Sequence, residues 1–217
     1  MNTKLIICPS VRPDLAVKFL ASFNNSHLVD QNWRVAILAQ GYTKEEIEHI
    51  KEYQCLIIES ETRMSPFEAR CLLMETFKAD IYASLDDDMK IGEHCRFDEM
   101  VKKLEDPSIW IIWCRHYSYR TPEEIKKQML NDKFTDMKIM SCWGWLLFRK
   151  DVAECILAYK RTNWLYDDIV ISLISYINWY TNLKYHLSLN EHNICWDTTV
   201  QNVLQEWQPL DETLITV

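Results

Sequence analysis

Short apolar runs alternate with amphipathic segments through the first 85 residues of the chain. The runs are typical of buried strands, and the segments between them carry apolar residues at helical spacing. The predicted order is strand 4–10, helix 13–23, strand 33–41, helix 43–53, strand 55–60, helix 65–79 and strand 80–85. This alternation predicts right-handed crossover connections and a largely parallel sheet.

Residues that favour helix starts stand at the beginning of each of these predicted helices. Pro13 opens the first, because proline fits the first turn of a helix. Thr43 with Glu46 three residues later has the pattern of a capping box. Ser65 followed by Pro66 predicts a capped start for the third helix.

The second half of the chain gives a more mixed pattern. It predicts a helix around 97–104, a strand at 108–115, an apolar segment at 141–151, helices at 151–160 and 166–180, and a strand with a following loop within 183–197. Residues 198–217 give no clear signal. A chain of 217 residues with 48% hydrophobic content is long enough to bury one α/β core, so we expect a single domain.

Composition narrows the class of protein. No run of about 18 uninterrupted apolar residues occurs, and Pro9, Arg12 and Pro13 interrupt the start where a signal peptide would be apolar. We therefore expect a soluble, cytoplasmic protein without membrane insertion, whose eight cysteines are reduced core residues. The net charge of −8 argues against a generally basic surface for nucleic acid. The segment 113–165 nevertheless carries ten Lys or Arg against six acids.

Three successive carboxylates, Asp86, Asp87 and Asp88, follow the strand predicted at 80–85. They form either a solvated acidic turn or a divalent-metal site at the edge where open α/β sheets bind ligands. If the strand continued, Asp86 and Asp88 would point to one side and Asp87 to the other. In that geometry Asp88 would ligate the metal, and Asp86 would reach a ribose hydroxyl or a metal-bound water.

The scarcity of glycine favours the metal interpretation. The three glycines, Gly41, Gly92 and Gly144, cannot form a glycine-rich phosphate-binding loop. A phosphorylated ligand would therefore need another source of positive charge. Carboxylates that hold Mg²⁺ or Mn²⁺ provide it, because these hard cations prefer oxygen ligands and can bridge two phosphates.

Four segments of the chain, in order, resemble the landmarks of GT-A fold nucleotide-sugar glycosyltransferases, close to the large inverting family 2. They are ICPSVRPDLAVKFLASF, SPFEARCLLMETFKADIYASLDDDM, SCWGWLLFRKDV and WLYDDIVISLISYI, and the likeness spans roughly residues 5–192. The resemblance implies one Rossmann-like α/β domain with a mixed, mainly parallel sheet flanked by helices. Residues 1–92 would form its nucleotide-sugar-binding half and 93–217 its acceptor-binding half.

The resemblance also implies roles on the donor side. Asp86 and Asp88 correspond to the D-x-D pair that holds the metal, Mn²⁺ or Mg²⁺, and the diphosphate of the nucleotide sugar. Arg12 and Arg70, together with Asp86 and Asp87, would contact the donor. Arg12 has an alternative as an ordinary solvated loop residue.

On the acceptor side, the resemblance implies that Trp143, Gly144 and Trp145 line the donor sugar and the acceptor entrance, together with Asp167. Asp168 matches the catalytic base, and an inverting transfer needs one base and one Lewis acid. Alternatives remain open, since the two aspartates also suit a helix N-terminus and the tryptophans also suit a core.

A histidine is implied as a further metal contact. His192 is favoured because it is predicted in a loop, whereas His186 lies in the strand-like KYHLSL. The chain also departs from the family pattern. AILAQGYTKEE lacks the paired aspartates that many members use to bind uracil, Asp167 replaces a glutamate, and Cys71 replaces an asparagine. UDP remains the expected carrier, although the sequence does not assign the nucleotide.

These inferences predict a metal-dependent inverting glycosyltransferase that moves a hexose from a nucleotide sugar, with UDP as carrier, to an acceptor hydroxyl. The acceptor is left open among a glycan, a protein and a hydroxymethylated DNA base. A nucleotidyltransferase or metal-dependent phosphotransferase that uses the same carboxylates is the alternative from another enzyme class. A non-catalytic binding module of the same fold is the third hypothesis.

Overall fold

The structure is a computed structural model that describes residues 3–116, 134–137, 145–158 and 181–192. Its strands are β1 (Lys4–Ser10), β2 (Trp33–Gln40), β3 (Cys55–Ser60), β4 (Ile81–Leu85), β5 (Met89–His94), β6 (Ile109–His116), β7 (Phe134–Met137), β8 (Trp145–Arg149) and β9 (Thr181–His192). Its helices are α1 (Pro13–Asn24), α2 (Lys44–Lys51), α3 (Pro66–Thr76), α4 (Phe97–Lys103) and α6 (Lys150–Ala158). The pattern did not predict β5 and β7; the helix predicted at 166–180 lies outside the described residues.

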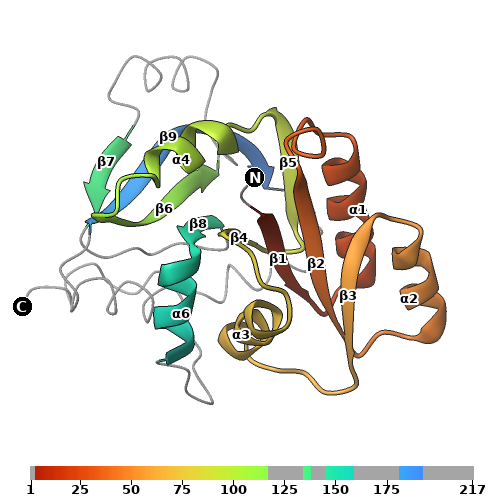
Figure 1. The fold of residues 1–217 in the computed structure, drawn as a ribbon. Coiled ribbons are helices and arrows are strands. Elements are labelled where there is room, and N and C mark those ends of the chain that lie inside the picture. Colours follow the sequence, from red (N-terminus) through yellow and green to blue (C-terminus); the bar gives the residue numbers. More distant parts are fainter. Residues whose placement is uncertain (1–2, 117–133, 138–144, 159–180, 193–217) are drawn as a thin grey trace, which may run out of the picture.

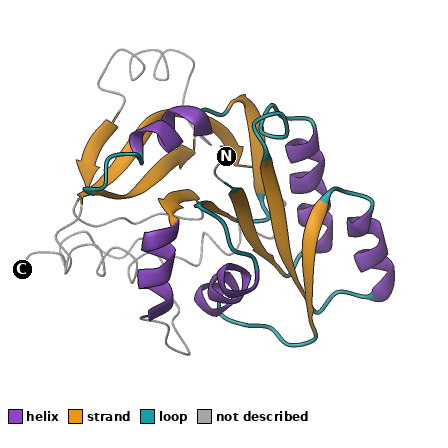
Figure 2. Ribbon diagram, in the orientation of Figure 1, coloured by secondary structure: helices purple, strands orange, loops and turns teal. Residues whose placement is uncertain are grey.

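One sheet runs through the described parts of the chain in the order β3-β2-β1-β4-β8-β6-β9-β5, and β7 pairs with β9. The strands β3, β2, β1 and β4 are parallel to one another. Beyond them β8 pairs antiparallel with β4 and β6, whereas β9 is parallel to β6 and antiparallel to β5. The predicted class, an α/β fold with a mixed sheet and flanking helices, is confirmed (Figures 1 and 2).

The parallel strands are held between two layers of helices. The connections through α1 and α2 lie on one face, where these helices contact each other, and α3 lies with α6 on the other (Figure 1). The buried side of α1 is formed by residues at helical spacing: Ala16, Phe19, Leu20 and Phe23. Burying one large apolar side chain stabilises a fold by about 1.5–3 kcal/mol. The ends of β1 and β4, which lie in this core, are therefore fixed in position.

The helix starts follow the predicted signals. Pro13 is the first residue of α1, and both α2 and α3 begin with complete capping boxes. At α2 the Thr43 hydroxyl accepts the backbone N–H of Glu46 at 3.3 Å, and the Glu46 carboxylate accepts the backbone N–H of Thr43 at 2.7 Å. This box fixes the chain just after β2, where Gly41 has φ +73°, a value that favours glycine.

Thr43→Ala is expected to lower the free energy of unfolding by about 1 kcal/mol, because the N–H of Glu46 loses its side-chain acceptor. Urea denaturation measures the loss, provided that the slope of the unfolding free energy against urea concentration is the same in both proteins. Thr62→Ala is the matched control, since Thr62 is another exposed threonine between a strand and a helix. Equal stability of the two variants would contradict a capping role.

The described cysteines agree with the expectation of reduced residues. The side chains of five are described, and all are thiols: Cys8, Cys55, Cys71, Cys95 and Cys155. Three of them are buried, as small core residues commonly are. In the same described part of the chain, no helix combines the length and apolarity needed to cross a bilayer.

Candidate functional site

The candidate site lies where β1 and β4 end side by side. The two strands are parallel and in register from Lys4 opposite Ile81 to Ile7 opposite Ser84. The residues that follow them therefore emerge at the same edge of the sheet, the edge at which open α/β sheets bind ligands. Ser10 ends β1, and the turn that begins at Asp86 follows β4.

Asp87 is the buried centre of this cluster. Only 3% of the residue is exposed, and its Oδ2 accepts a hydrogen bond of 2.5 Å from the Ser10 hydroxyl. Arg12 forms an ion pair with Asp87 Oδ1, and its Nε lies 3.4 Å from Oδ2. A buried carboxylate needs such donors because desolvation penalises its charge. Arg12 is thus a partner of the acidic turn rather than an ordinary solvated residue.

Asp88 shares the same arginine. Its Oδ2 lies 3.1 Å from Arg12 Nη2, and 22% of its side chain is exposed. Burial raises the pKa of Asp88 above its usual value; Arg12 lowers it, and the charge of Asp87 raises it further. For Arg12, burial lowers the pKa, but the hydrogen bonds and charges of the two aspartates outweigh burial and raise it. Asp88 is therefore a desolvated carboxylate beside a second negative charge, an environment that an added cation would stabilise.

Asp86 is held by the second arginine. Arg70 comes from α3 and is only 6% exposed. Its Nε donates to the Ser84 hydroxyl at 2.7 Å, and its Nη2 forms an ion pair with Asp86 Oδ1. Ser84 lies on β4 two residues before Asp86, so one arginine connects α3 to both the strand and the turn.

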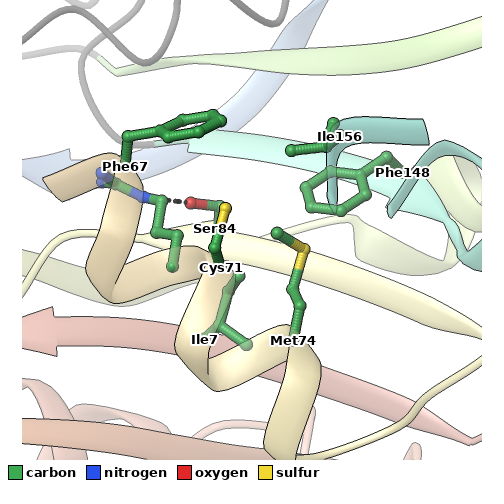
Figure 3. Close-up of a pocket in the computed structure, with 8 residues that line it drawn as sticks. Ile7, Phe67, Cys71, Met74, Ser84, Phe148 and Ile156 are labelled. Atoms are coloured by element: carbon green, nitrogen blue, oxygen red, sulfur yellow. Dashed lines mark hydrogen bonds between the residues drawn. The ribbon is translucent and has the colours of Figure 1, made fainter. Parts of the chain in front are cut away.

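A small cavity of about 10 Å³ lies beside Arg70 (Figure 3). It is lined by Ile7, Phe67, Arg70, Cys71, Met74, Ser84, Phe148 and Ile156. The labelled side chains in Figure 3 are mainly apolar, and the space can hold at most about one water molecule. It is therefore a packing gap under the site and no binding pocket for a sugar or a nucleotide.

Arg70→Lys is expected to lower the free energy of unfolding by about 1–3 kcal/mol, even though it keeps the charge. A lysine ammonium cannot reproduce the fork that reaches Ser84 and Asp86 together, and hydrogen bonds to charged groups contribute about 1.5–3 kcal/mol each. Chemical denaturation measures the difference. The exposed Arg34 supplies the control Arg34→Lys. If both variants are as stable as the wild type, the two contacts of Arg70 contribute nothing to folding.

The sequence reasoning missed three members of the cluster. Ser10, Tyr42 and Ser84 hold the charged residues in place, and the Tyr42 hydroxyl lies 2.5 Å from the Ser10 hydroxyl. Ser10 ends β1, and Tyr42 follows β2 by two residues. Their positions at the ends of adjacent parallel strands were the available signal, because such ends meet at one edge of a sheet.

The strand alternation considered for the three aspartates does not occur. β4 ends at Leu85, and Asp87 and Asp88 lie in a turn that leads into β5. The turn brings Asp87 and Asp88 to the same arginine and leaves Asp86 with Arg70. In an extended strand Asp87 and Asp88 would point to opposite faces, whereas the turn lets both pair with Arg12, whose charge compensates two neighbouring carboxylates.

His192 lies in a strand, not in the predicted loop. It is the last residue of β9, and its backbone is registered opposite Met89, the residue after Asp88. His186 also lies on β9, as predicted. The backbone at residues 88 and 192 therefore lies close together in space, although these positions are 104 apart in the sequence. The observed strand continues past Asn190 to His192, where the sequence predicted a loop.

The acceptor-side candidates are only partly described. Trp145 begins β8, and its backbone is registered opposite Leu85, directly before the acidic turn. Trp143, Gly144, Asp167 and Asp168 lie outside the described residues.

The donor set fits a divalent cation that is held by few protein ligands. Among the side chains that the structure describes, no three or more of His, Cys, Asp and Glu are grouped to hold a metal ion. Mg²⁺-type sites commonly use one or two carboxylates together with substrate phosphates, and the partly exposed carboxylates of Asp86 and Asp88, two residues apart in the turn, suit that role.

Several solved glycosyltransferases share this fold. GalNAc-T7 with UDP, GalNAc and Mn²⁺ is 12% identical with a TM-score of 0.67, over 88% of this chain and 44% of that one. The mannosyltransferase PcManGT from Pyrobaculum calidifontis with GDP-Man and Mn²⁺ is 13% identical with a TM-score of 0.63, over 83% and 54%. Staphylococcus aureus TarS 1–349 with UDP-GlcNAc is 10% identical with a TM-score of 0.64, over 87% and 57%.

The chain thus spans about half the length of these structures. Neither a protein-family model nor a curated protein sequence matches it. At this level of identity the likeness concerns the fold alone. The expectation of a GT-A fold, drawn from four short segments of sequence, is confirmed.

Proposed function

We propose that this protein is a metal-dependent glycosyltransferase that transfers a sugar from a nucleotide sugar to an acceptor hydroxyl with inversion. The observation that supports it best is the cluster at the ends of β1 and β4. There, two arginines and three aspartates from distant parts of the chain meet at the ligand-binding edge of a GT-A fold. Clustered charged groups at the ligand-binding edge of a sheet are candidates for a functional site.

The donor is proposed to be a UDP-sugar, with a GDP-sugar as the alternative carrier. The similar structures carry UDP with GalNAc, GDP-Man and UDP-GlcNAc, and two of them carry Mn²⁺. A hexose is proposed for the same reason. This chain lacks paired aspartates after β2. The choice of nucleotide therefore rests on the shared fold of the similar structures and not on matching residues.

On the donor side, Asp86 and Asp88 would hold the cation, Mn²⁺ or Mg²⁺, with His192 as the proposed third protein contact. When bound, the cation supplies stabilisation of the negative charge on the departing diphosphate. Arg12 is proposed to contact the diphosphate directly, because 47% of its side chain is exposed while one edge is anchored on Asp87. Arg70 is too deeply buried for that and would keep Asp86 oriented.

On the acceptor side, Asp168 is proposed as the base that takes the proton from the acceptor hydroxyl as that oxygen attacks the anomeric carbon. A positioned carboxylate can do this in a single displacement, without a covalent enzyme intermediate. Trp143, Gly144 and Trp145, with Asp167, would line the donor sugar and the acceptor entrance. Aromatic faces suit the apolar faces of sugar rings.

The proposal extends to residues 93–217 as the acceptor-binding half of a single domain, with a glycan, a protein or a hydroxymethylated DNA base as acceptor. The net positive segment 113–165 favours an acceptor with negative charge, such as modified DNA. Binding through phosphates would weaken steeply with salt. A duplex base would have to leave the stack to reach the catalytic base.

The test is incubation of the full chain with Mn²⁺ and a panel of nucleotide sugars. Nucleoside diphosphate release is measured without acceptor and with glycan, protein and hydroxymethylated DNA. Acceptor-dependent release of UDP or GDP supports the proposal, and mass spectrometry of the acceptor identifies the sugar. Release of a monophosphate or of pyrophosphate would instead indicate a nucleotidyltransferase or phosphotransferase. Absence of turnover with tight donor binding would indicate a binding module.

A further inference from the structure

Tyr42 is the one member of the charged cluster that comes from the β2–α2 connection. Its ring is half-buried and packs against the core, and its hydroxyl lies 2.5 Å from the hydroxyl of Ser10. Ser10 in turn lies 2.5 Å from Asp87 Oδ2. The three groups form a chain from the outside of the cluster to its buried carboxylate.

The direction of these hydrogen bonds follows from counting protons. A serine hydroxyl has one proton and two acceptor sites, whereas an ionised carboxylate can only accept. Ser10 must therefore donate to Asp87 and accept from Tyr42. Its oxygen also accepts the backbone N–H of Arg12 at 3.2 Å, which completes its hydrogen bonds. Burial raises the pKa of Tyr42 above its usual value, so the phenol keeps the proton that it donates.

Arg12 is thus held from two sides by groups that depend on Tyr42. Its backbone N–H is bound by Ser10, and its guanidinium is paired with Asp87, the carboxylate that Ser10 also holds. Ser10 has a competing acceptor in the carbonyl oxygen of Arg12, at 3.4 Å. Donation from Tyr42 strengthens the short bond from Ser10 to Asp87, because hydrogen bonds in a chain polarise one another.

We propose that Tyr42 is a positioning residue for the diphosphate-binding arginine, acting through Ser10 on Asp87 and Arg12. The inference rests on the proposed function in that it takes Arg12 to contact a nucleoside diphosphate. Without the phenol, the Ser10 hydroxyl is free to turn to the Arg12 carbonyl. Asp87 then depends more heavily on the guanidinium, which leaves Arg12 less available to phosphate.

The test compares Tyr42→Phe with Tyr53→Phe. Both tyrosines are half-buried, pack against the core and flank α2, so each change removes one phenol hydroxyl and retains the ring. Calorimetry with UDP and with GDP, each with Mn²⁺, measures affinity. We expect about two- to tenfold weaker binding for Tyr42→Phe, the range for one net hydrogen bond, and unchanged binding for Tyr53→Phe.

A second measurement needs no ligand. The side-chain Nε–H signal of Arg12, assigned with Arg12→Lys, is followed in ¹⁵N spectra. We expect it to shift in Tyr42→Phe and to stay in place in Tyr53→Phe. In a Ser10→Ala background, Tyr42→Phe should cause no further loss of affinity, because the connecting hydroxyl is already gone.

The possible results distinguish the positioning role of Tyr42 from the proposed function of the protein. If the wild type binds UDP or GDP, unchanged affinity in Tyr42→Phe, or a loss of affinity without a shift of the Arg12 signal, overturns the role of Tyr42. A wild-type chain that binds neither nucleotide, but whose Arg12 signal shifts in Tyr42→Phe, retains the positioning of Arg12 by Tyr42 and overturns the proposed function with a UDP- or GDP-sugar as donor. A lower melting temperature alone, with equal affinity, indicates a merely structural hydroxyl.

Discussion

Replacing Asp168 by asparagine is expected to lower kcat for sugar transfer by about 10²- to 10⁴-fold, the range for losing a general base. Donor affinity should stay nearly unchanged, because the residues proposed to hold the nucleotide and the cation belong to a different part of the chain. Asparagine has almost the same shape and cannot accept the proton of the acceptor hydroxyl. The measurement is a single-turnover assay at saturating donor, together with calorimetric binding of UDP.

The exposed Asp30 provides the matched control, since Asp30→Asn removes one carboxylate from the turn that precedes β2, at the other end of the parallel strands from the acidic turn. Full activity in both variants would exclude Asp168 as the base. A loss of donor binding in Asp168→Asn would instead move this residue to the donor side of the site. Only a fall in kcat with retained UDP binding supports the proposed role.

The second large effect concerns Asp88→Asn. Turnover is expected to fall by about 10²-fold or more, because a metal held by fewer carboxylates loses several kcal/mol of transition-state stabilisation. The same variant should melt at a higher temperature than the wild type at pH 7 in the presence of a chelator. One substitution thus removes activity and adds stability.

The sign of the stability change follows from the environment of Asp88. Burial raises its pKa in the folded chain, and this outweighs the opposite effect of Arg12. A carboxyl group with a raised folded pKa destabilises the fold at neutral pH; this cost starts to fall as the pH drops to that pKa and is gone below the pKa of the unfolded chain. Asparagine has no charge at any pH. The difference in melting temperature between variant and wild type should therefore narrow in acid.

Added Mn²⁺ provides the complementary observation. A ligand at 100 times its Kd stabilises a fold by about 2.7 kcal/mol, so Mn²⁺ should raise the melting temperature of the wild type. It should do so much less in Asp88→Asn. An equal Mn²⁺ response in both proteins would show that Asp88 is not a ligand, and a destabilised variant would show that the pairing with Arg12 outweighs burial.

The first 85 residues were predictable because their signals are local. Capping residues, apolar runs and helical spacing act within a few positions, so the pattern predicted β1 to β4 and the helices between them correctly. Arg12, Arg70 and the three aspartates were also identified as candidates from sequence. Their pairing was not, because it depends on the turn after Leu85 and on arginines that are distant from the aspartates in sequence.

The second half was less predictable because its pairings are non-local. β5 has only six residues and packs beside a strand nearly 100 positions later, so nothing near it in sequence indicates an extended segment. His192 was expected in a loop because polar residues surround it, although β9 continues through them to pair with β5. Ser10 and Tyr42 were missed for a related reason, because the role of a hydroxyl depends on hydrogen-bond partners that are distant in sequence.

The antiparallel pairing of β5 with β9 has a consequence for how the chain folds during its synthesis on the ribosome. The four parallel strands can pair with one another once residue 85 has emerged, because all of these pairings lie within the first 85 residues. The strand that leaves the acidic turn gains its described partner only when residue 192 has been synthesised. Nascent chains that stall earlier would carry both arginines and all three carboxylates beside an open sheet edge, which is a place for intermolecular association.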